Sequence, residues 1–428
     1  MKWRMRYLTM FVSALLLVTL SFVLWTSNQK KILRIGVYAG SSWDVPNSRE
    51  NRVLDNIIRQ FEKSYPNVKV VYESGIPKKD YDNWLAEKIL KGEQADVFMV
   101  PENDFSMLAS SGAFKSLDSL ISKEEAPAYY PVAYQAGQYQ GNSYALPIES
   151  NPVMMCVNKD LLEKEGISIP DSNWTLEDLY AICQKVTKDT DGDGLIDQYG
   201  ITDYTWKQAL VAYNGHLRNQ NGVNIDSVEM HQALSFISKL DSLNQRYKVT
   251  SNDFDEGKVA FYPMSLAQYR TYKPYPYHVA KYSRFSWTCI PMPAAKAGIP
   301  ATQVKTSLFA MSSKTKQDKL AWEFMKLLCQ NHKNQQELFA KSQGTSVLTS
   351  VVKSSQTKKI LQADDFGLDS LTSQRLDHMM KHSVLDISRD LDYHSLERLD
   401  YLLGNALKNN EIDSILPSIQ REMEETGK

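Results

Sequence analysis

Apolar residues along this chain recur with two spacings, one typical of strands and one typical of helices. The segments 32–39 (ILRIGVYA), 68–72 and 95–100 (ADVFMV) are short and mostly apolar, which predicts buried strands. Between them, apolar residues repeat at helical intervals in 50–63 and 81–90. The order strand, helix, strand, helix, strand predicts a parallel sheet covered by helices on both faces. Ligands of such sheets bind beyond the carboxyl ends of the strands.

The stretch 144–158 predicts a passage of the chain from one body into a second. Two strand-like segments flank Pro147 and Pro152 there, as expected where a chain leaves one sheet and enters another. Strand-like segments at 286–291 and 306–312 predict the return passage. Two crossings in opposite directions imply two lobes joined by hinge strands, with a cleft between them.

We therefore predict an α/β protein in which each lobe is a sheet flanked by helices. The first lobe comprises 32–147 with about 307–362, and the second comprises 148–306 with about 363–428. The tail from about Ser370 has helical spacing throughout.

The amino terminus has the features of an export signal. Basic residues at positions 2, 4 and 6 precede an uncharged, mostly apolar run at 8–25. That run is longer than a signal core of about 7 to 15 residues and just shorter than the ~20 residues of a comfortable spanning helix. The segment 1–31 is thus either a signal sequence or an uncleaved anchor in the membrane. We favour the anchor because no small-x-small cleavage site follows the run.

Composition excludes some functional classes. The 428 residues include 49 Lys and Arg against 50 Asp and Glu, and the longest basic clusters are pairs, which argues against nucleic-acid binding. The 23 Tyr and 8 Trp exceed what a core alone requires, so some of these rings are expected in a binding cleft.

The four cysteines show no metal-binding spacing and lie in apolar surroundings. If all four formed disulfides, they could pair in three ways. Buried free thiols are the favoured interpretation, and one disulfide stays open in an exported protein. No Cys precedes Cys156, which excludes a lipid-modified amino-terminal Cys.

An acidic, glycine-containing loop has the spacing of a calcium site. Carboxylates occupy positions 1, 3, 5 and 9 of the loop, and Gly194 occupies position 6, where such loops turn sharply. Gly200 stands at position 12, so the usual bidentate Glu is missing. The loop is either a structural Ca²⁺ site or a solvated turn without metal. Its ligands would be Asp189, Asp191, Asp193, Asp197 and the carbonyl of Leu195.

Several motifs together resemble the extracellular solute-binding proteins of ABC importers, in the sugar-binding group that includes maltose-binding protein. They are LPIES at 146–150, VNKDL at 157–161, the loop and following residues at 191–200, FDEGKVA at 254–260, and KLAWEFMK at 319–326. The resemblance covers essentially the whole exported part. It implies a two-lobed periplasmic-binding-protein-like fold of type II, a location at the outer face of a bacterial cell membrane, anchored or secreted, and membrane permease subunits as partners.

A sugar site requires aromatic rings that stack on C–H faces and nearby carboxylates or amides that bind hydroxyls. Each ring named here would also fit core packing, and each carboxylate would also fit a solvated or helix-capping role. The candidates in the first lobe and at the crossover are Trp43, Asp44, Glu102, Asp104, Glu149 and Asn151. Those in the second lobe and tail are Trp206, Tyr213, Asn214, Tyr262, Ser265 and Tyr393, the last where the resemblance implies a cleft-lining helix.

Three other functions compete with sugar import. A secreted glycoside hydrolase would also need aromatic rings and two carboxylates, about 5 to 9.5 Å apart, but no nucleophile, metalloprotease or phosphate-loop motif is present. A membrane-anchored sensing subunit would keep the fold and use the anchor. Import of a metal ion could use the pair Tyr129-Tyr130. We expect a monomer that binds carbohydrate, with no catalytic residue and no cofactor apart from the Ca²⁺ named above.

Overall fold

The computed structural model describes residues 30–43, 45, 50–101, 103–122, 126–245, 247–272, 284–363 and 370–426. The predicted export segment up to residue 29, Asp44 and Glu102 lie outside these residues. Among the helices that are described, none is both long and apolar enough to cross a membrane.

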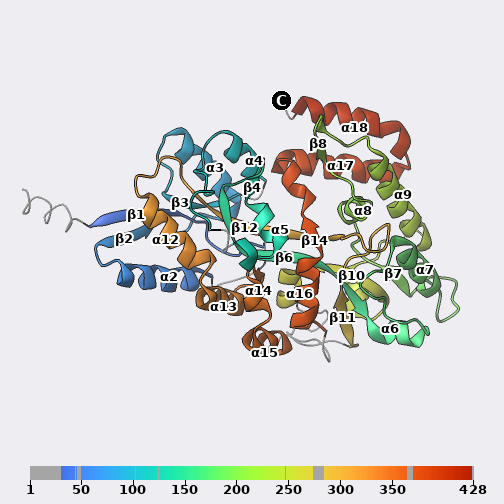
Figure 1. Cartoon of the computed structure of the whole chain (residues 1–428). Helices are drawn as coiled ribbons and strands as arrows, with labels where there is room; N and C mark the ends of the chain where they lie inside the picture. The colour runs from blue at the N-terminus through green and yellow to red at the C-terminus, as the bar shows by residue number, and fades with distance from the viewer. Residues whose placement is uncertain are drawn as a thin grey trace, which may run out of the picture.

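The first lobe is built on the parallel strands predicted from the sequence. Strand β1 (Lys31–Gly36) pairs in parallel with β2 (Val68–Tyr72) on one side and with β3 (Val97–Val100) on the other. Helix α2 (Glu50–Ser64) and helix α3 (Lys78–Leu90) lie on opposite sides of this sheet (Figure 1). The carboxyl ends of the three strands point toward the rest of the molecule (Figure 1). The order of strands and helices predicted from the sequence is confirmed.

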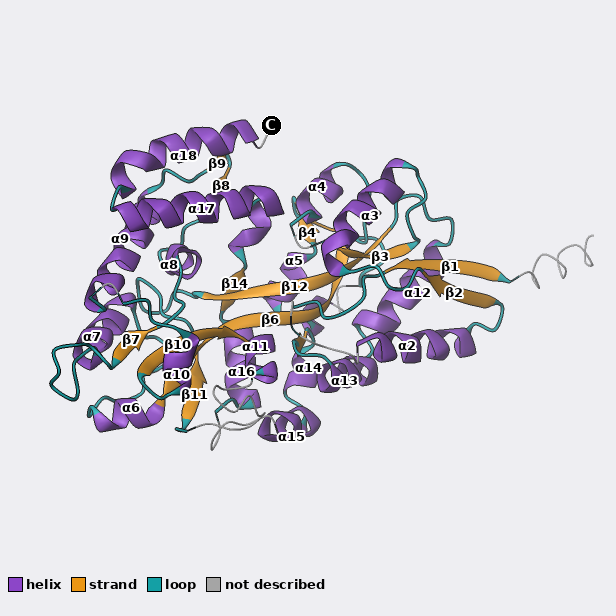
Figure 2. Ribbon diagram, turned by 180° about the vertical axis from the view of Figure 1, so that it is seen from behind, coloured by secondary structure: helices purple, strands orange, loops and turns teal. Residues whose placement is uncertain are grey.

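Two long strands join the lobes. Strand β6 (Ala145–Asn158) pairs with β12 (Thr302–Met311) along its first half, and with β10 (Val259–Ser265) and β11 (Trp287–Ile290) along its second half. The described sheet thus runs through both lobes in the order β2-β1-β3-β12-β6-β10-β7 (Figure 2). The predicted passage between lobes is confirmed.

The division of this passage into two separate strands was wrong, because β6 is one strand of 14 residues. The ladder with β12 accommodates Pro147 through a register shift: Ser307 pairs with Glu149, the next residue Leu308 pairs with Pro147, and Ile148 is the extra residue between them. Such a bulge leaves one residue unpaired without ending the strand.

The second lobe packs helices around β10 and β7 (Tyr199–Ile201), which are parallel neighbours. Helix α7 (Leu176–Val186) starts at a capping box formed by Thr175 and Asp178. The other helices of this lobe include α6 (Lys159–Lys164), α8 (Trp206–Ala212), α9 (Val228–Leu243), α10 (Ser251–Asp255) and α11 (Leu266–Thr271).

The remaining elements complete the two lobes and their junction. The first lobe and the junction contain α4 (Phe105–Ser110), η1 (Ala126–Ala128), α5 (Pro131–Ala136), α12 (Asp318–Cys329), α13 (His332–Lys341), β13 (Thr345–Ser346), α14 (Thr349–Val352) and α15 (Ser355–Ala363). Two short hairpins are formed by β4 (Gln138–Tyr139) with β5 (Asn142–Ser143), and by β8 (Arg218–Asn219) with β9 (Gly222–Val223).

The tail is mostly helical, as predicted, but it contains a strand. Between α16 (Ser373–Lys381) and α17 (Tyr393–Asn409), the residues of β14 (Ser383–Leu385) pair in parallel with β12, and a short 3₁₀ helix, η2 (Ile387–Asp390), follows. Three residues are too few to show an alternating pattern in sequence. Since β12 is a hinge strand, this pairing places the start of α17 at the junction of the lobes, and α18 (Ile412–Thr426) packs behind α17.

Candidate functional site

Side chains of both lobes meet beside the hinge strand β12. A hollow of about 20 Å³ is lined there by Phe105 and Ala136 of the first lobe and by Leu385, Asp386 and Arg389 of the second, with β12 as its floor. The Arg389 Nη2 donates a hydrogen bond to the Ala136 carbonyl (3.3 Å), and its guanidinium lies 5.5 Å from the centre of the Phe105 ring. The lobes are therefore in direct contact at this point, and the candidate site extends from it.

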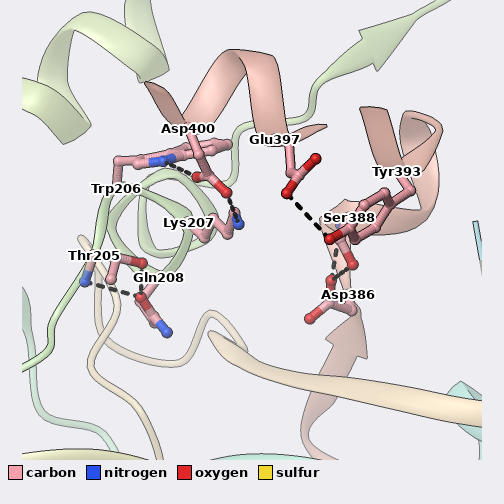
Figure 3. A network of polar contacts seen from close by, with 9 residues as sticks. All are labelled: Thr205, Trp206, Lys207, Gln208, Asp386, Ser388, Tyr393, Glu397 and Asp400. Carbon is pink, nitrogen blue, oxygen red and sulfur yellow. Dashed lines mark hydrogen bonds and ion pairs between the residues drawn. The ribbon is translucent and has the colours of Figure 1, made fainter. Parts of the chain in front are cut away.

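Helices α8 and α17 lie next to each other on the surface of the second lobe that carries the candidate site (Figure 3). We call this surface the interlobe face. The indole Nε1 of Trp206 donates to Asp400 Oδ1 (2.8 Å), and Lys207 Nζ lies 2.6 Å from Asp400 Oδ2. Thr205 and Gln208 form a capping box at the start of α8, which fixes the position of Trp206. Trp206 is only 5% exposed, so most of its ring packs in the core rather than lying open as a platform.

Tyr393 presents the exposed aromatic ring of this face. It is the first residue of α17 and is 58% exposed, and its hydroxyl donates to Glu397 Oε1 (3.1 Å), one turn further along the helix. Figure 3 shows Glu397 between the Trp206–Asp400 pair on one side and Tyr393 on the other. An exposed ring next to a carboxylate is the combination that a sugar requires, since the ring stacks on C–H groups and the carboxylate accepts from hydroxyls.

Asp104 is the corresponding acidic group of the first lobe. It stands at the N-cap of α4, and its side chain makes no capping hydrogen bond. Burial, followed by the negative charges of Asp82 on α3 and Asp392 at the start of α17, raises the pKa of Asp104 to about 6. Because such charge effects weaken with distance, Asp392 of the second lobe lies near enough to Asp104 of the first for its charge to act on it.

Trp43 and Glu149 are brought together, but in the interior. Glu149 is 3% exposed and accepts hydrogen bonds from the Ser342 hydroxyl and from the Gly344 N–H (2.8 Å). The Trp43 Nε1 lies beside the same carboxylate without a hydrogen-bond partner in good geometry. Burial raises the pKa of Glu149 to about 7, against the contacts with Ser342, Gly344 and Trp43 and the charge of Arg270, which lower it.

Asn151 and Ser265 use their polar atoms to hold helix α11. Asn151 Oδ1 accepts from the Ala267 N–H (3.0 Å), and Ser265 Oγ accepts from the Gln268 N–H (3.2 Å) at the start of that helix. Tyr262 packs edge-on against Phe254, with a centroid distance of 5.3 Å. Burial raises its pKa. These three predicted residues therefore lie around the junction of β6, β10 and α11.

Tyr213 and Asn214 follow the far end of α8. With a rise of about 1.5 Å per residue, seven positions separate Tyr213 from Trp206 by about 10 Å along the axis. Tyr213 packs against the core of the second lobe, and Asn214 is exposed with a φ of 59°. The structure does not bring this pair next to Trp206 and Tyr393. Tyr129 and Tyr130, considered for metal import, are buried, and the Tyr130 hydroxyl donates to Asp377.

The acidic loop brings three of its four carboxylates together. Oxygen atoms of Asp189, Asp191 and Asp193 all lie within 4.8 Å of one another. Hydrogen bonds from the N–H groups of Gly194 and Gly192 (2.7 Å each) lower the pKa of Asp189. Oxygen donors of this kind fit a hard cation. Asp197 instead accepts from the N–H and hydroxyl of Thr190 (2.9 and 2.7 Å), and Leu195 is exposed.

Several residues of the interlobe face were not predicted from the sequence, namely Lys207, Arg389, Glu397 and Asp400. Charged residues on an amphipathic helix are normally solvated, and nothing in their spacing distinguishes these from their neighbours.

A separate cavity of about 880 Å³ lies between α3 and the outer strands of the first lobe, where Trp84 Nε1 donates to Glu73 (3.2 Å). It is at the edge of the sheet opposite the second lobe.

Comparison with known proteins gives the same architecture. A family model described as bacterial extracellular solute-binding protein matches residues 56–364. A maltotriose-binding protein of Pyrococcus abyssi is 25% identical over 138 residues, which are 32% of this chain and 30% of that protein, so the chain matches less than a third of that relative's length.

Two solved structures are similar over nearly the whole chain. The sugar-binding protein MalE from Xanthomonas citri is 14% identical with a TM-score of 0.74, and the match covers 92% of this chain and 97% of that one. An ABC substrate-binding protein from Listeria monocytogenes in complex with cycloalternan is 18% identical with a TM-score of 0.66, covering 93% and 99%. At these identities the likeness shows the fold, and the predicted two-lobed α/β architecture is confirmed.

Proposed function

Since this chain belongs to the family of bacterial extracellular solute-binding proteins, we propose that it binds a carbohydrate between its lobes and delivers it to the permease subunits of an ABC importer. The family predicted from the sequence motifs is thereby confirmed. The names of relatives, among them a maltotriose-binding protein and a protein in complex with cycloalternan, support an oligosaccharide as the ligand.

The observation that supports this function best is the exposed Tyr393 ring beside Glu397, at the start of the helix whose N-cap residue, Asp392, acts by its charge on Asp104 of the other lobe. A ring and a carboxylate on one lobe would bind the apolar face and the hydroxyls of a sugar. Carboxylates on the other lobe would accept further hydroxyl hydrogen bonds. A ligand between the lobes would therefore contact both of them.

Binding would act on the arrangement of the lobes. Contacts to both lobes exist only when the lobes are close, so a ligand shifts the balance toward the closed form by its differential affinity. The contact of Arg389 with Ala136 and Phe105 would set how closely the two faces approach at the hinge. The permease would then recognise the closed form.

The other sequence predictions complete the proposal. The protein would act at the outer face of the membrane, attached through the apolar run at 8–25, as a monomer and without catalysis. The loop of Asp189, Asp191 and Asp193 would hold a structural Ca²⁺.

The test is thermal unfolding of the exported part, from Ile32 onward, with a panel of mono- and oligosaccharides. A ligand at 100 times its Kd adds about 2.7 kcal/mol to stability, which is readily seen as a rise in Tm. Saturable stabilisation by one saccharide class, with the saccharide recovered intact, is the expected result. Stabilisation with release of cleavage products would instead support a glycoside hydrolase. No shift with any saccharide would overturn the proposed ligand class.

A further inference from the structure

Two of the four cysteines face each other in the core of the second lobe. Cys156 of β6 and Cys289 of β11 are direct partners in an antiparallel ladder, and their Sγ atoms are 3.6 Å apart. Both side chains are fully buried. They are separated by 133 positions in the chain, so only the fold brings them together.

The hydrogen-bond pattern shows which kind of pair they form. Lys159 N donates to Ser286 O (2.8 Å), so these two residues form a hydrogen-bonded pair of the ladder. Hydrogen-bonded and non-hydrogen-bonded pairs alternate along antiparallel strands. Cys156 and Cys289 lie three steps further along and are therefore a non-hydrogen-bonded pair. In agreement, the Cys289 N–H donates to Ser370 O (2.8 Å), on the side away from β6.

This geometry is suited to a covalent bond. In non-hydrogen-bonded pairs the Cα atoms are about 4.5 Å apart and the side chains are closest. That separation falls within the roughly 4.4 to 6.8 Å spanned by disulfides. The two sulfurs would need only a small side-chain rotation, without a shift of either strand.

The other two cysteines lie in different places. Cys183 is in the core between α7 and β7, against Gly200, and Cys329 ends helix α12 in the core of the first lobe. Of the six cysteine pairs that could form a single disulfide, the structure thus brings together Cys156 and Cys289 and leaves Cys183 and Cys329 as thiols.

We propose that Cys156 and Cys289 form a disulfide when the chain folds outside the cytoplasm in the presence of a disulfide-bearing oxidant. One Cys thiolate attacks a sulfur of the oxidant, whose S–S bond breaks and releases one thiol. The second Cys thiolate then attacks the mixed disulfide and releases the second thiol. The two cysteines lose two hydrogens and two electrons in all, and the oxidant is reduced to two thiols.

The burial of both sulfurs determines when this reaction takes place. Neither is accessible once β6, β11 and the aromatic residues around Trp287 have packed, so the oxidant must react before folding is complete. The bond would close a loop that contains most of the second lobe, which restricts the unfolded chain and so stabilises the native lobe.

The experiment refolds the protein from denaturant in a buffer of oxidised and reduced glutathione, and in parallel under full reduction. Free thiols are then counted in denaturant, and peptides are mapped without reduction. The expected result is two free thiols after oxidising refolding and all four after reducing refolding, with one peptide pair linked through Cys156 and Cys289. Four free thiols in both samples, or a linkage through Cys183 or Cys329, would overturn the proposal.

Variants give an independent measurement of the same bond. C156A should abolish the difference in Tm between oxidised and reduced samples, whereas the control C329A should keep it and show one free thiol after oxidation. A Tm difference that survives in C156A would count against this pair. The peptide map uses the unmodified chain, so the result does not depend on how well any variant folds.

Discussion

Ser150 of β6 and Thr306 of β12 form a buried hydrogen bond between their hydroxyl groups, 2.9 Å long, where the two hinge strands pass from one lobe to the other. The two residues are also backbone partners in the ladder. This side-chain contact therefore connects the two strands at the point about which the lobes would move.

Replacing Ser150 by Ala should lower the free energy of unfolding by about 1 to 2 kcal/mol, because it leaves the buried Thr306 hydroxyl without its partner. The double variant S150A/T306V should lose less than the sum of the two single variants, since neither hydroxyl then remains unpaired. Urea denaturation of the four proteins measures this coupling. If the loss of the double variant equals the sum of the two single losses, the contact between the two hydroxyl groups contributes nothing to stability.

Removing the Tyr393 ring should weaken carbohydrate binding at least tenfold and leave stability nearly unchanged, because the ring is exposed. The matched control is Y401A on the same helix. Tyr401 is 61% exposed, and Arg398, whose guanidinium lies 5.5 Å from the centre of its ring, is bound to Glu422, so Tyr401 lies on the side of α17 next to α18. Calorimetric titration with the saccharide found for the unmodified protein compares the two variants, and equal affinities would rule out the role given to Tyr393.

Gly344 should not tolerate a side chain. A Cβ at this position would lie 2.6 Å from both Glu149 Oε1 and Trp43 Nε1, so G344A is expected to destabilise the protein by about 1 to 3 kcal/mol. G404A provides the contrast, since nothing lies within 4 Å of its added methyl group and Ala is preferred to Gly within a helix. Thermal unfolding of both variants should give shifts of opposite sign, and a G344A protein as stable as the original would contradict the packing described here.

Glu149 should make stability depend on pH. Its pKa is about 7 in the folded protein, against 4.5 as the ordinary value. At a pH between these two values, the folded protein therefore keeps a proton on Glu149 that the unfolded chain has lost. Stability should therefore fall as the pH rises from about 4.5 to 7, by up to roughly 3 kcal/mol. E149Q cannot titrate and should show a shallower fall in urea denaturation at pH 5 and pH 8. E177Q, which removes an exposed carboxylate from α7, is the control and should follow the unmodified protein. If E149Q loses as much stability between pH 5 and pH 8 as the unmodified protein, the pH dependence arises from other groups.

Calcium should raise the Tm if the acidic loop holds it. The double variant D191N/D193N keeps both side-chain oxygens that accept from the backbone N–H groups of Asp193 and Leu195, so the loop should keep its shape while it loses two charges. Its Tm should no longer respond to Ca²⁺. D171N alters a similar exposed turn of the same lobe, where Asp171 accepts from the Asn173 N–H, and should retain the response. The absence of any calcium effect on the unmodified protein would favour the solvated turn.

The sequence predicted the fold more completely than the site, for physical reasons. Strands such as 95–100 are buried on both faces, so their apolar character is explicit in sequence, whereas β14 depends on pairing with β12 and has no local signal. Ring type alone did not separate Trp206, which is covered and bonded to Asp400, from Tyr393, which is exposed. That difference arises from tertiary packing. Likewise, the carboxylate of Glu149 is typical of a ligand group in sequence but is enclosed by Ser342 and Gly344, which are almost two hundred positions away.

The continuity of β6 and β12 through both lobes limits how the molecule can move. Because one hydrogen-bonded ladder runs across the junction, neither lobe can slide along or away from the other without breaking backbone hydrogen bonds. Relative motion must therefore be torsional, spread as extra twist and bend over many peptide units and concentrated at the bulge beside Pro147. Twisting such a sheet costs elastic free energy. The stiffness of the sheet therefore sets how much of the ligand-binding free energy is used to close the lobes.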